Sequence, residues 1–292
     1  MLKNWRNTIY TEDAEVLSHD EFDGDQYILR LQAPKIAADA IAGSFVHIRC
    51  ADLLPMRRPI SIMRVDTKTG VIELLYKKLG EGTRLLSQRQ IGEKLSVMGP
   101  IGKPFDPDPS RAKPLLIGGG VGMPPMVFLA DQITHGDKYP EHKPFVILGS
   151  EVPFPFNIQP SPDKVAGLPN SVIGSMPLME QWGVDCRLAS LQGYPGTHKG
   201  YVTDLARLWL DGLSDDERQQ VEVFSCGPHP MLEAVAKLAA EYDLPCQVSL
   251  EEFMACAVGG CAGCVVKVKT DNGPAMQRVC VDGPVFEAAR VF

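Results

Sequence analysis

The sequence has 292 residues, of which 45% are hydrophobic and 22% are charged, and its formal net charge is -7. This length and apolar content predict about two ordinary domains with real cores, and the acidic balance argues against a nucleic-acid-binding surface. No apolar run of signal-peptide or membrane-spanning type is found, so we expect a cytoplasmic enzyme without a membrane span. The eight cysteines would then be reduced, which argues against a disulfide framework.

Residues 25–102 are predicted to form a series of short strands. Apolar or alternating runs, which include QYILRLQA, GSFVHIRC, PISIMRVD, VIELLYKK and EKLSVMGP, are separated by turn residues at regular spacing. This pattern favours an antiparallel barrel or sandwich over a helical domain.

Two segments of this region carry groups that suit a phosphate. Arg58, Pro59 and Ser61 place a guanidinium and a hydroxyl three residues apart at the start of a predicted strand. Gly82 and Thr83 lie where a predicted helix begins, and free N–H groups there attract anions. Each segment alone is also typical of an ordinary turn. On one barrel, the two together predict a site for a flavin diphosphate.

Residues 103–114 contain four prolines and almost no apolar side chains, which predicts a linker. The pattern then changes to strands that alternate with helices, in PLLIGGGVGMPPMVFLADQI, FVILGS and VEVFSCGPHPMLEAVAKLAAEY. Such alternation predicts a parallel sheet with ligands at the carboxyl ends of its strands. A helix is expected again in HKGYVTDLARLWL, with Thr203 as its N-cap, whereas residues 151–200 show little periodicity and allow no fold prediction.

Two strand ends in this region are candidates for nucleotide binding. Glycines that permit close backbone approach follow the first strand, at Gly118, Gly119, Gly120 and Gly122. Pro125 departs from the dinucleotide fingerprint, and a tight strand-to-helix corner is the alternative interpretation. Cys226, Gly227 and Pro228 repeat this arrangement after a later strand. Cys226 is either a buried small side chain or a sulfur beside a nicotinamide ring.

The C-terminal part contains a cysteine motif with a specific spacing. Cys256, Cys261 and Cys264 follow a C-x4-C-x2-C pattern, and Cys280 is a fourth cysteine downstream. Thiolates at this spacing match the plant-type ligand pattern of a 2Fe-2S cluster, and the glycines between them allow tight turns. A structural zinc site and unrelated thiols are the alternatives. Cys50, Cys186 and Cys246 have no partner motif and are interpreted as structural.

In this order, the motifs resemble the ferredoxin-NADP reductase-like superfamily with a C-terminal 2Fe-2S domain. Within it the chain most resembles the electron-transfer subunits of two-subunit, NAD-dependent dihydroorotate dehydrogenases. The points of likeness are RRPISI, GEGTRLLS, KGYVTDL, SCGPHPML, SLEEFMACAVGGCAGC and CVDGPVFEA. The resemblance implies a multi-domain fold: an FAD-binding antiparallel β-barrel at 1–105, an NAD-binding α/β domain with a parallel sheet at 106–245, and a small 2Fe-2S domain at 246–292.

The resemblance also implies cofactor roles for the candidate residues. FAD would be bound by Arg58, Pro59, Ser61, Gly82 and Thr83. NAD(H) would be bound by Gly118, Gly119, Gly120, Gly122, Gly227 and Pro228, with Cys226 as the catalytic residue beside the nicotinamide. The cluster would be held by Cys256, Cys261, Cys264 and Cys280. The implied partner is an FMN-containing dihydroorotate dehydrogenase catalytic subunit in a heterotetramer.

The chain departs from the family pattern at a few points, and other functions remain open. The segment at 151–195 is longer than usual, Ala257 and Gly260 stand where glycine and alanine are expected, and Val281 replaces an expected lysine. The same cofactors would serve a flavin subunit of an NAD(P)H-ferredoxin, sulfide or hydrogenase-type complex. A non-catalytic zinc-binding module is an alternative of another class. The choice between NAD and NADP stays open.

Overall fold

The computed structural model describes residues 9–292, which divide into two compact units. The first unit contains residues 9–105, 249–286 and 291, and the second contains residues 106–248, 287–290 and 292. The segment that carries the four motif cysteines therefore groups with the N-terminal residues.

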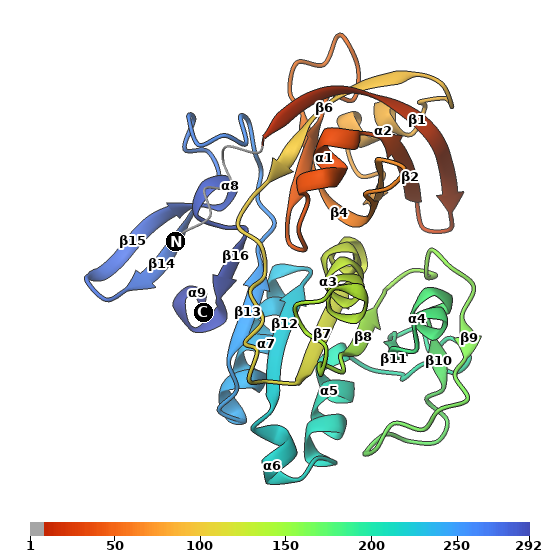
Figure 1. The fold of residues 1–292 in the computed structure, drawn as a ribbon, viewed down its shortest axis with the longest axis vertical. Helices are drawn as coiled ribbons and strands as arrows, with labels where there is room; N and C mark the ends of the chain where they lie inside the picture. Colours follow the sequence, from red (N-terminus) through yellow and green to blue (C-terminus); the bar gives the residue numbers. More distant parts are fainter. Residues whose placement is uncertain (1–8) are drawn as a thin grey trace. The chain divides into compact units, whose positions relative to one another are not determined.

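The N-terminal part of the first unit is a closed antiparallel barrel with the strand order β1-β2-β5-β4-β3-β6 (Figure 1). Its strands are β1 (Tyr10–Phe22), β2 (Gln26–Gln32), β3 (Phe45–Ile48), β4 (Arg58–Asp66), β5 (Val71–Lys77) and β6 (Lys94–Ile101). Two short helices accompany them, α1 (Pro34–Asp39) and α2 (Glu81–Leu86). Alternate side chains such as Leu29 and Leu31 are fully buried, which is the period that the apolar pattern predicts. The predicted barrel is confirmed.

The long strand β1 was not among the predicted strands. Its sequence, YTEDAEVLSHDEF, is dominated by polar residues, and only Ala14 and Val16 are buried. The strand is fixed by its pairing with β2 on one side and β6 on the other. Closure of the barrel therefore determines this strand, and its own hydrophobic pattern does not.

The second unit is built on a sheet with the strand order β11-β8-β7-β12-β13-β16. Its strands are β7 (Lys113–Gly119), β8 (Phe145–Gly149), β11 (Asp185–Ala189), β12 (Val221–Cys226), β13 (Cys246–Ser249) and β16 (Val285–Glu287). The pairs β11–β8, β7–β8 and β12–β7 are parallel, as the alternation of strands and helices predicts. The associated helices are η2 (Gly120–Gly122), α3 (Met123–His135), α4 (Pro177–Trp182), α5 (Val202–Asp211), α6 (Asp215–Arg218), α7 (His229–Glu241) and α9 (Ala288–Val291).

The segment between β8 and β11 has little regular structure. It contains only the two-residue strands β9 (Gln159–Pro160) and β10 (Gly174–Ser175) and the short helix α4. The helix α5 that follows begins differently from the prediction, because its N-cap is Tyr201 and not Thr203. The Tyr201 backbone N–H donates to the Asp204 carboxylate at 2.9 Å, so an acidic side chain inside the helix secures this end.

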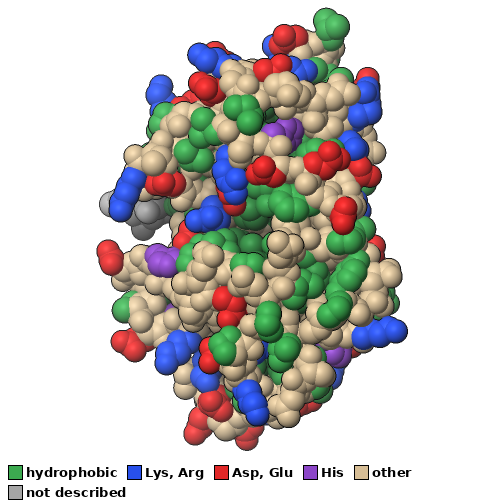
Figure 2. Space-filling model, turned by 90° about the vertical axis from the view of Figure 1, so that its right-hand side faces the viewer, with side chains coloured by type: hydrophobic (Ala, Val, Ile, Leu, Met, Phe, Trp, Pro, Cys, Tyr) green, Lys and Arg blue, Asp and Glu red, His purple; other side chains and the backbone are tan. Residues whose placement is uncertain are grey.

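The C-terminal part of the first unit is a small hairpin with a helical turn. It consists of β14 (Val265–Thr270), β15 (Gly273–Arg278) and α8 (Val279–Asp282), and β14 and β15 pair antiparallel. Among residues 9–292, none of the helices combines the length and the apolar character that crossing a lipid bilayer requires. On the face shown in Figure 2, acidic and basic side chains are intermixed with hydrophobic ones.

The start of the proline-rich segment is tied to the second unit by buried polar groups. Gln247 accepts a hydrogen bond from the Asp106 backbone N–H at 3.1 Å and donates to the Asp106 carbonyl at 2.8 Å. It also donates to Glu222 at 2.9 Å, and Glu222 accepts from the Asp108 backbone N–H at 2.8 Å. The backbone after residue 105 is therefore held in one place.

We expect the substitution Gln247→Ala to lower the stability of the second unit by about 2–3 kcal/mol, because it leaves several buried polar groups without partners. The measurement is the thermal unfolding midpoint, which should fall by several degrees. Gln219→Ala, at an exposed position of the same unit, is the matched control and should leave the midpoint unchanged. An unchanged midpoint for the Gln247 variant would show that water replaces these hydrogen bonds.

Candidate redox site

The first three motif cysteines lie in a loop that precedes β14, and the fourth lies in α8. The two segments meet where the Val279 backbone N–H donates to the Cys264 carbonyl at 2.9 Å. Cys264 and Cys280 are buried, whereas Cys256 is partly exposed and Cys261 is exposed. The loop therefore presents one edge of the site to the surface.

Backbone N–H groups of the loop point at the sulfur atoms. The Cys261 N–H donates to Cys256 Sγ at 3.4 Å, and the Gly263 N–H donates to Cys261 Sγ at 3.4 Å. The Cys280 N–H donates to Cys264 Sγ at 3.5 Å. Such contacts stabilise thiolates and tune the clusters that thiolates hold.

The cysteine thiols differ in pKa because their surroundings differ. Burial acts to raise the pKa of Cys256, but backbone N–H groups, with those of Val258 and Cys261 foremost, outweigh it and lower the pKa to about 6. Burial and the neighbouring Cys264 thiol raise the pKa of Cys280 to about 12. A thiolate forms readily at the exposed edge of the loop, while Cys280 needs a positive ion to lose its proton.

The loop backbone adopts left-handed conformations to make these turns. Gly259 has a φ of 84°, and Ala257 and Ala262 have φ values of 55° and 51°. A Cβ on Gly259 would lie 2.5 Å from the Val281 side chain, so this position requires glycine. Arg278, which sequence reasoning missed, donates from Nη1 to the Gly259 carbonyl at 3.2 Å. No motif marks this arginine, because its partner is a backbone carbonyl.

The residue types and their spacing suit a two-iron cluster. Among residues 9–292, no group of three His, Cys, Asp or Glu side chains is placed to hold a metal ion. Backbone N–H contacts connect Cys261 with Cys256 Sγ and Cys280 with Cys264 Sγ. Four thiolates on two irons give two per iron, whereas tetrahedral zinc needs all four around one centre.

The two candidate flavin segments meet in the barrel unit. A Cβ on Gly82 would lie 2.5 Å from Arg58 Nε, so the guanidinium lies directly against this glycine. Arg58 Nη1 donates to the Met56 carbonyl at 2.8 Å and to the Arg57 carbonyl at 3.2 Å. A guanidinium held this way on a side-chain-free backbone forms a cradle that suits a diphosphate.

The other flavin candidates, Thr83, Pro59 and Ser61, take part in the structure of the barrel unit itself. The Thr83 hydroxyl accepts from the Leu79 and Gly80 N–H groups at 3.0 and 3.2 Å, so it serves as part of the α2 cap. Pro59 and Ser61 lie in β4, opposite His47 and Phe45 of β3. Arg57 is structural, because its Nη1 donates to the Ser96 carbonyl at 2.6 Å across the barrel.

The nucleotide candidates are brought together at the ends of β7 and β12, where Gly118 pairs with Cys226. A Cβ on Gly122 would lie 2.3 Å from the Cys226 carbonyl oxygen, so the two turns pack backbone to backbone. Gly118 faces Met123 at the start of α3. Of the four glycines in this turn, only Gly120, with a φ of 56°, has no described heavy atom within 4 Å of a Cβ position. Gly120 is therefore the glycine of this turn that is open to a ligand.

A methionine that sequence reasoning missed fills the space between these turns. Met231 Sδ would lie 2.4 Å from a Cβ on Gly119, and Met231 Cε would lie 2.4 Å from one on Gly227. Both glycines thus accommodate the thioether. Pro228 is the N-cap of α7, and the Cys226 side chain is fully buried.

Cys50 and Cys186 are buried as well, and burial raises the pKa of each thiol to about 11, in keeping with a structural role.

Two family models match the chain. The model for the iron-sulfur cluster binding domain of dihydroorotate dehydrogenase B matches residues 251–292, and the model for the oxidoreductase FAD-binding domain matches residues 11–105. The first covers all four motif cysteines, and the second covers the barrel with Arg58 and Gly82.

Curated relatives resemble the chain over nearly its whole length. The dihydroorotate dehydrogenase B (NAD(+)) electron transfer subunit of Desulforamulus reducens is 33% identical over 281 residues, which cover 96% of this chain and 97% of that protein. The subunit of the same name from Listeria monocytogenes is 34% identical over 283 residues, covering 96% of this chain and 98% of the relative.

Solved structures share the fold. A structure of the NADH-dependent reduced ferredoxin-NADP oxidoreductase aligns with a TM-score of 0.73 and 22% identity, and the alignment covers 96% of this chain and 90% of that one. The ferredoxin reductase of carbazole 1,9a-dioxygenase aligns with a TM-score of 0.60 and 20% identity, over 81% and 67% of the two chains. These likenesses confirm the reductase-like fold.

We expect Gly82→Ala to weaken FAD binding at least about tenfold, since the new methyl group would push the Arg58 guanidinium off its seat. Titration of the flavin-free protein with FAD, followed by flavin fluorescence, measures the dissociation constant. Gly80→Ala is the control, because nothing described lies within 4 Å of its Cβ position. Equal affinity of the Gly82 variant and the control would show that Arg58 does not hold the diphosphate.

We expect Ala262→Gly to make the cysteine loop more stable by about 1 kcal/mol, because glycine adopts a positive φ without the steric penalty of a Cβ. Ala262 is exposed, so the methyl group contributes little packing. The half-life of the visible iron-sulfur absorbance on mild heating should increase. Ala275→Gly, at an exposed position of β15, should not increase it.

Proposed function

Because this chain belongs to the family of electron transfer subunits of NAD-dependent dihydroorotate dehydrogenase B, we propose that it carries electrons from a separate dihydroorotate-oxidising subunit to NAD. The observation that carries this proposal is the cysteine motif, in which backbone N–H groups donate to the sulfurs of Cys256, Cys261 and Cys264. Similarity over 96% of the chain supports it.

The proposed assignment gives each part of the chain one role. Cys256, Cys261, Cys264 and Cys280 hold the 2Fe-2S cluster. Arg58, against Gly82, binds the FAD diphosphate, with Pro59, Ser61 and Thr83 as its neighbours. The turn with Gly118, Gly119, Gly120 and Gly122 binds NAD through the open backbone of Gly120, and Cys226, Gly227 and Pro228 form the adjoining turn.

The number of cofactors follows from electron counting. A nicotinamide exchanges two electrons as a hydride, an iron-sulfur cluster exchanges one at a time, and a flavin does both. The protein's own contribution is to fix the thiolates, to hold a guanidinium at the diphosphate, and to keep a small sulfur side chain at Cys226. Cys226 is a small side chain, and it is fully buried at its strand end.

The partner is proposed to be an FMN-containing catalytic subunit in a heterotetramer with this chain. The names of the relatives, as electron transfer subunits, support a catalytic partner. The sequence also shows no group placed as a base for dihydroorotate, in keeping with a subunit that never touches this substrate. A cytoplasmic location is part of the proposal, which the eight free thiols support.

We expect the purified chain, loaded with FAD and cluster, to reduce a dye with NADH but to form no orotate from dihydroorotate. In complex with the catalytic subunit, Cys261→Ser should lower dihydroorotate-dependent NAD reduction at least about 100-fold, since one thiolate of the cluster is lost. NADH-ferricyanide activity of the same variant should stay within about threefold of the wild type if ferricyanide takes its electrons from the flavin.

The control variant is Cys186→Ala, which removes a buried thiol that is not in the motif. It should retain about two irons per chain and the full activity of the complex. Orotate formation by the single chain, or full activity of Cys261→Ser in the complex, would contradict the proposed function. A colourless protein that contains zinc and no iron would instead support the zinc-binding alternative.

A further inference from the structure

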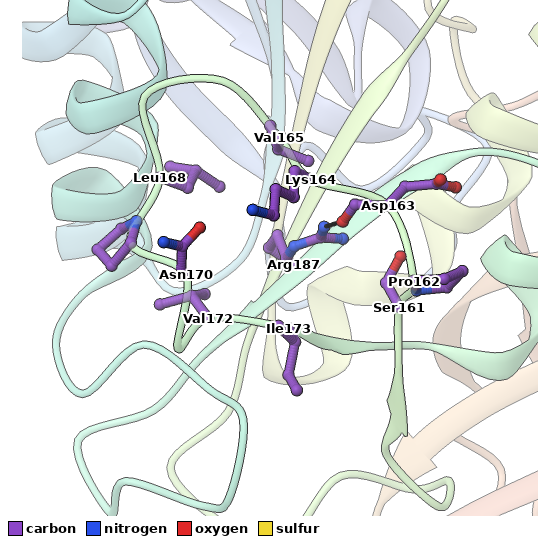
Figure 3. Close-up of a pocket in the computed structure, with 11 residues that line it drawn as sticks. Ser161, Pro162, Asp163, Lys164, Val165, Leu168, Asn170, Val172, Ile173 and Arg187 are labelled. Atoms are coloured by element: carbon purple, nitrogen blue, oxygen red, sulfur yellow. Dashed lines mark hydrogen bonds between the residues drawn. The ribbon is translucent and has the colours of Figure 1, made fainter.

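The long segment between β8 and β11 closes over a pocket of about 110 Å³ (Figure 3). Its polar lining includes Arg187, Lys164 and Asn170, and its apolar lining includes Leu168, Val172 and Ile173. In Figure 3, the Arg187 side chain lies among these residues, with Lys164 and Asp163 next to it. None of the lining residues belongs to the cysteine, flavin or nucleotide candidates described above.

Arg187 is a buried cation without a matching anion. It lies in β11, and only 1% of its surface is exposed. Nη1 donates to the Cys186 carbonyl at 2.6 Å and Nη2 donates to the Asp163 carbonyl, but Nε has no acceptor. Within the described part of the chain, no carboxylate oxygen lies within 4.0 Å of its nitrogens. A guanidinium buried in this way is unfavourable unless an anion compensates its charge.

The nearby acidic side chains in the described part of the chain form no ion pair with Arg187 within 4.0 Å. Asp163 presents its backbone carbonyl to Arg187, and its residue is exposed to solvent. Burial raises the pKa of Asp185, two residues away along β11, while the positive charge of Arg187 acts in the opposite direction. Lys164 adds a second positive charge at the pocket. Among the lining residues two side chains are positive and one, Asp163, is negative, and they adjoin an apolar wall.

We propose that this pocket binds a small carboxylate that carries a branched apolar group. The carboxylate accepts from Nε and Nη2 of Arg187 and takes the place of the Asp163 carbonyl, while the Lys164 ammonium lies beside it. The apolar group packs against Leu168, Val172 and Ile173. Because Nε of Arg187 is buried in the free protein, the proposed binding requires an outward shift of the coil around residues 163–165.

The test uses isovalerate as the probe and isothermal titration of the full chain. Saturable binding in the millimolar range is expected, with isovaleramide at least about tenfold weaker because it lacks the charge. Inorganic phosphate, which lacks the apolar group, should also be weaker. Lys164→Gln should weaken isovalerate binding about fivefold, and Lys143→Gln, at an exposed lysine of the same unit, should leave it unchanged.

Arg187→Met should abolish binding. If the Arg187 variant does not fold, Lys164→Gln still tests the proposal, because Lys164 is exposed and its substitution should not disturb folding. Three results would overturn the proposal: no saturable isovalerate binding at tens of millimolar, equal binding of the amide, or equal binding by the wild type and Lys164→Gln. Phosphate binding as tight as that of isovalerate would overturn the carboxylate assignment in the same way.

Discussion

The contact between backbone N–H groups and cysteine sulfur is the constraint on which the redox assignment depends. Four thiolates close together repel one another, and they are stable only where positive charge or oriented dipoles compensate them. The loop supplies these dipoles by turning through left-handed conformations at Ala257, Gly259 and Ala262. The strained backbone is therefore a direct consequence of aiming amide groups inward, and Arg278 helps to hold it through the Gly259 carbonyl.

Close backbone approach at glycine recurs in each candidate site, but the neighbour differs. The space that a Cβ would need is occupied by the Arg58 guanidinium at Gly82, by the Cys226 carbonyl at Gly122, and by the Met231 thioether at Gly119. Only Gly120 in its turn faces open space. A glycine-rich motif thus contains several glycines that serve packing and one that is available for a ligand. This distinction cannot be read from the sequence, because all of them are the same letter.

The sequence predicted most of the barrel and the alternating unit, because buried strands show an apolar pattern of their own. It failed where structure is set by partners far away along the chain. Strand β1 is polar and is held by β2 and β6, and the α5 cap is formed by Asp204, so Thr203 is not needed there. Among the site residues, the four cysteines were evident because ligand spacing is local. Met231 and Arg278 were not, since their roles arise only from contacts made in the folded chain.

The segment without a fold prediction is also held by contacts with residues far away along the chain. Residues 151–200 have few periodic apolar side chains, and the coil before β11 is tied to the sheet through polar contacts such as the hydrogen bond from Arg187 to the Asp163 carbonyl. A cation in the middle of a strand would normally predict a solvent-facing position. Here the strand is an edge strand of the sheet, and the coil itself covers the cation. A buried charge that holds a coil in place leaves that coil sensitive to any anion that competes for the same guanidinium.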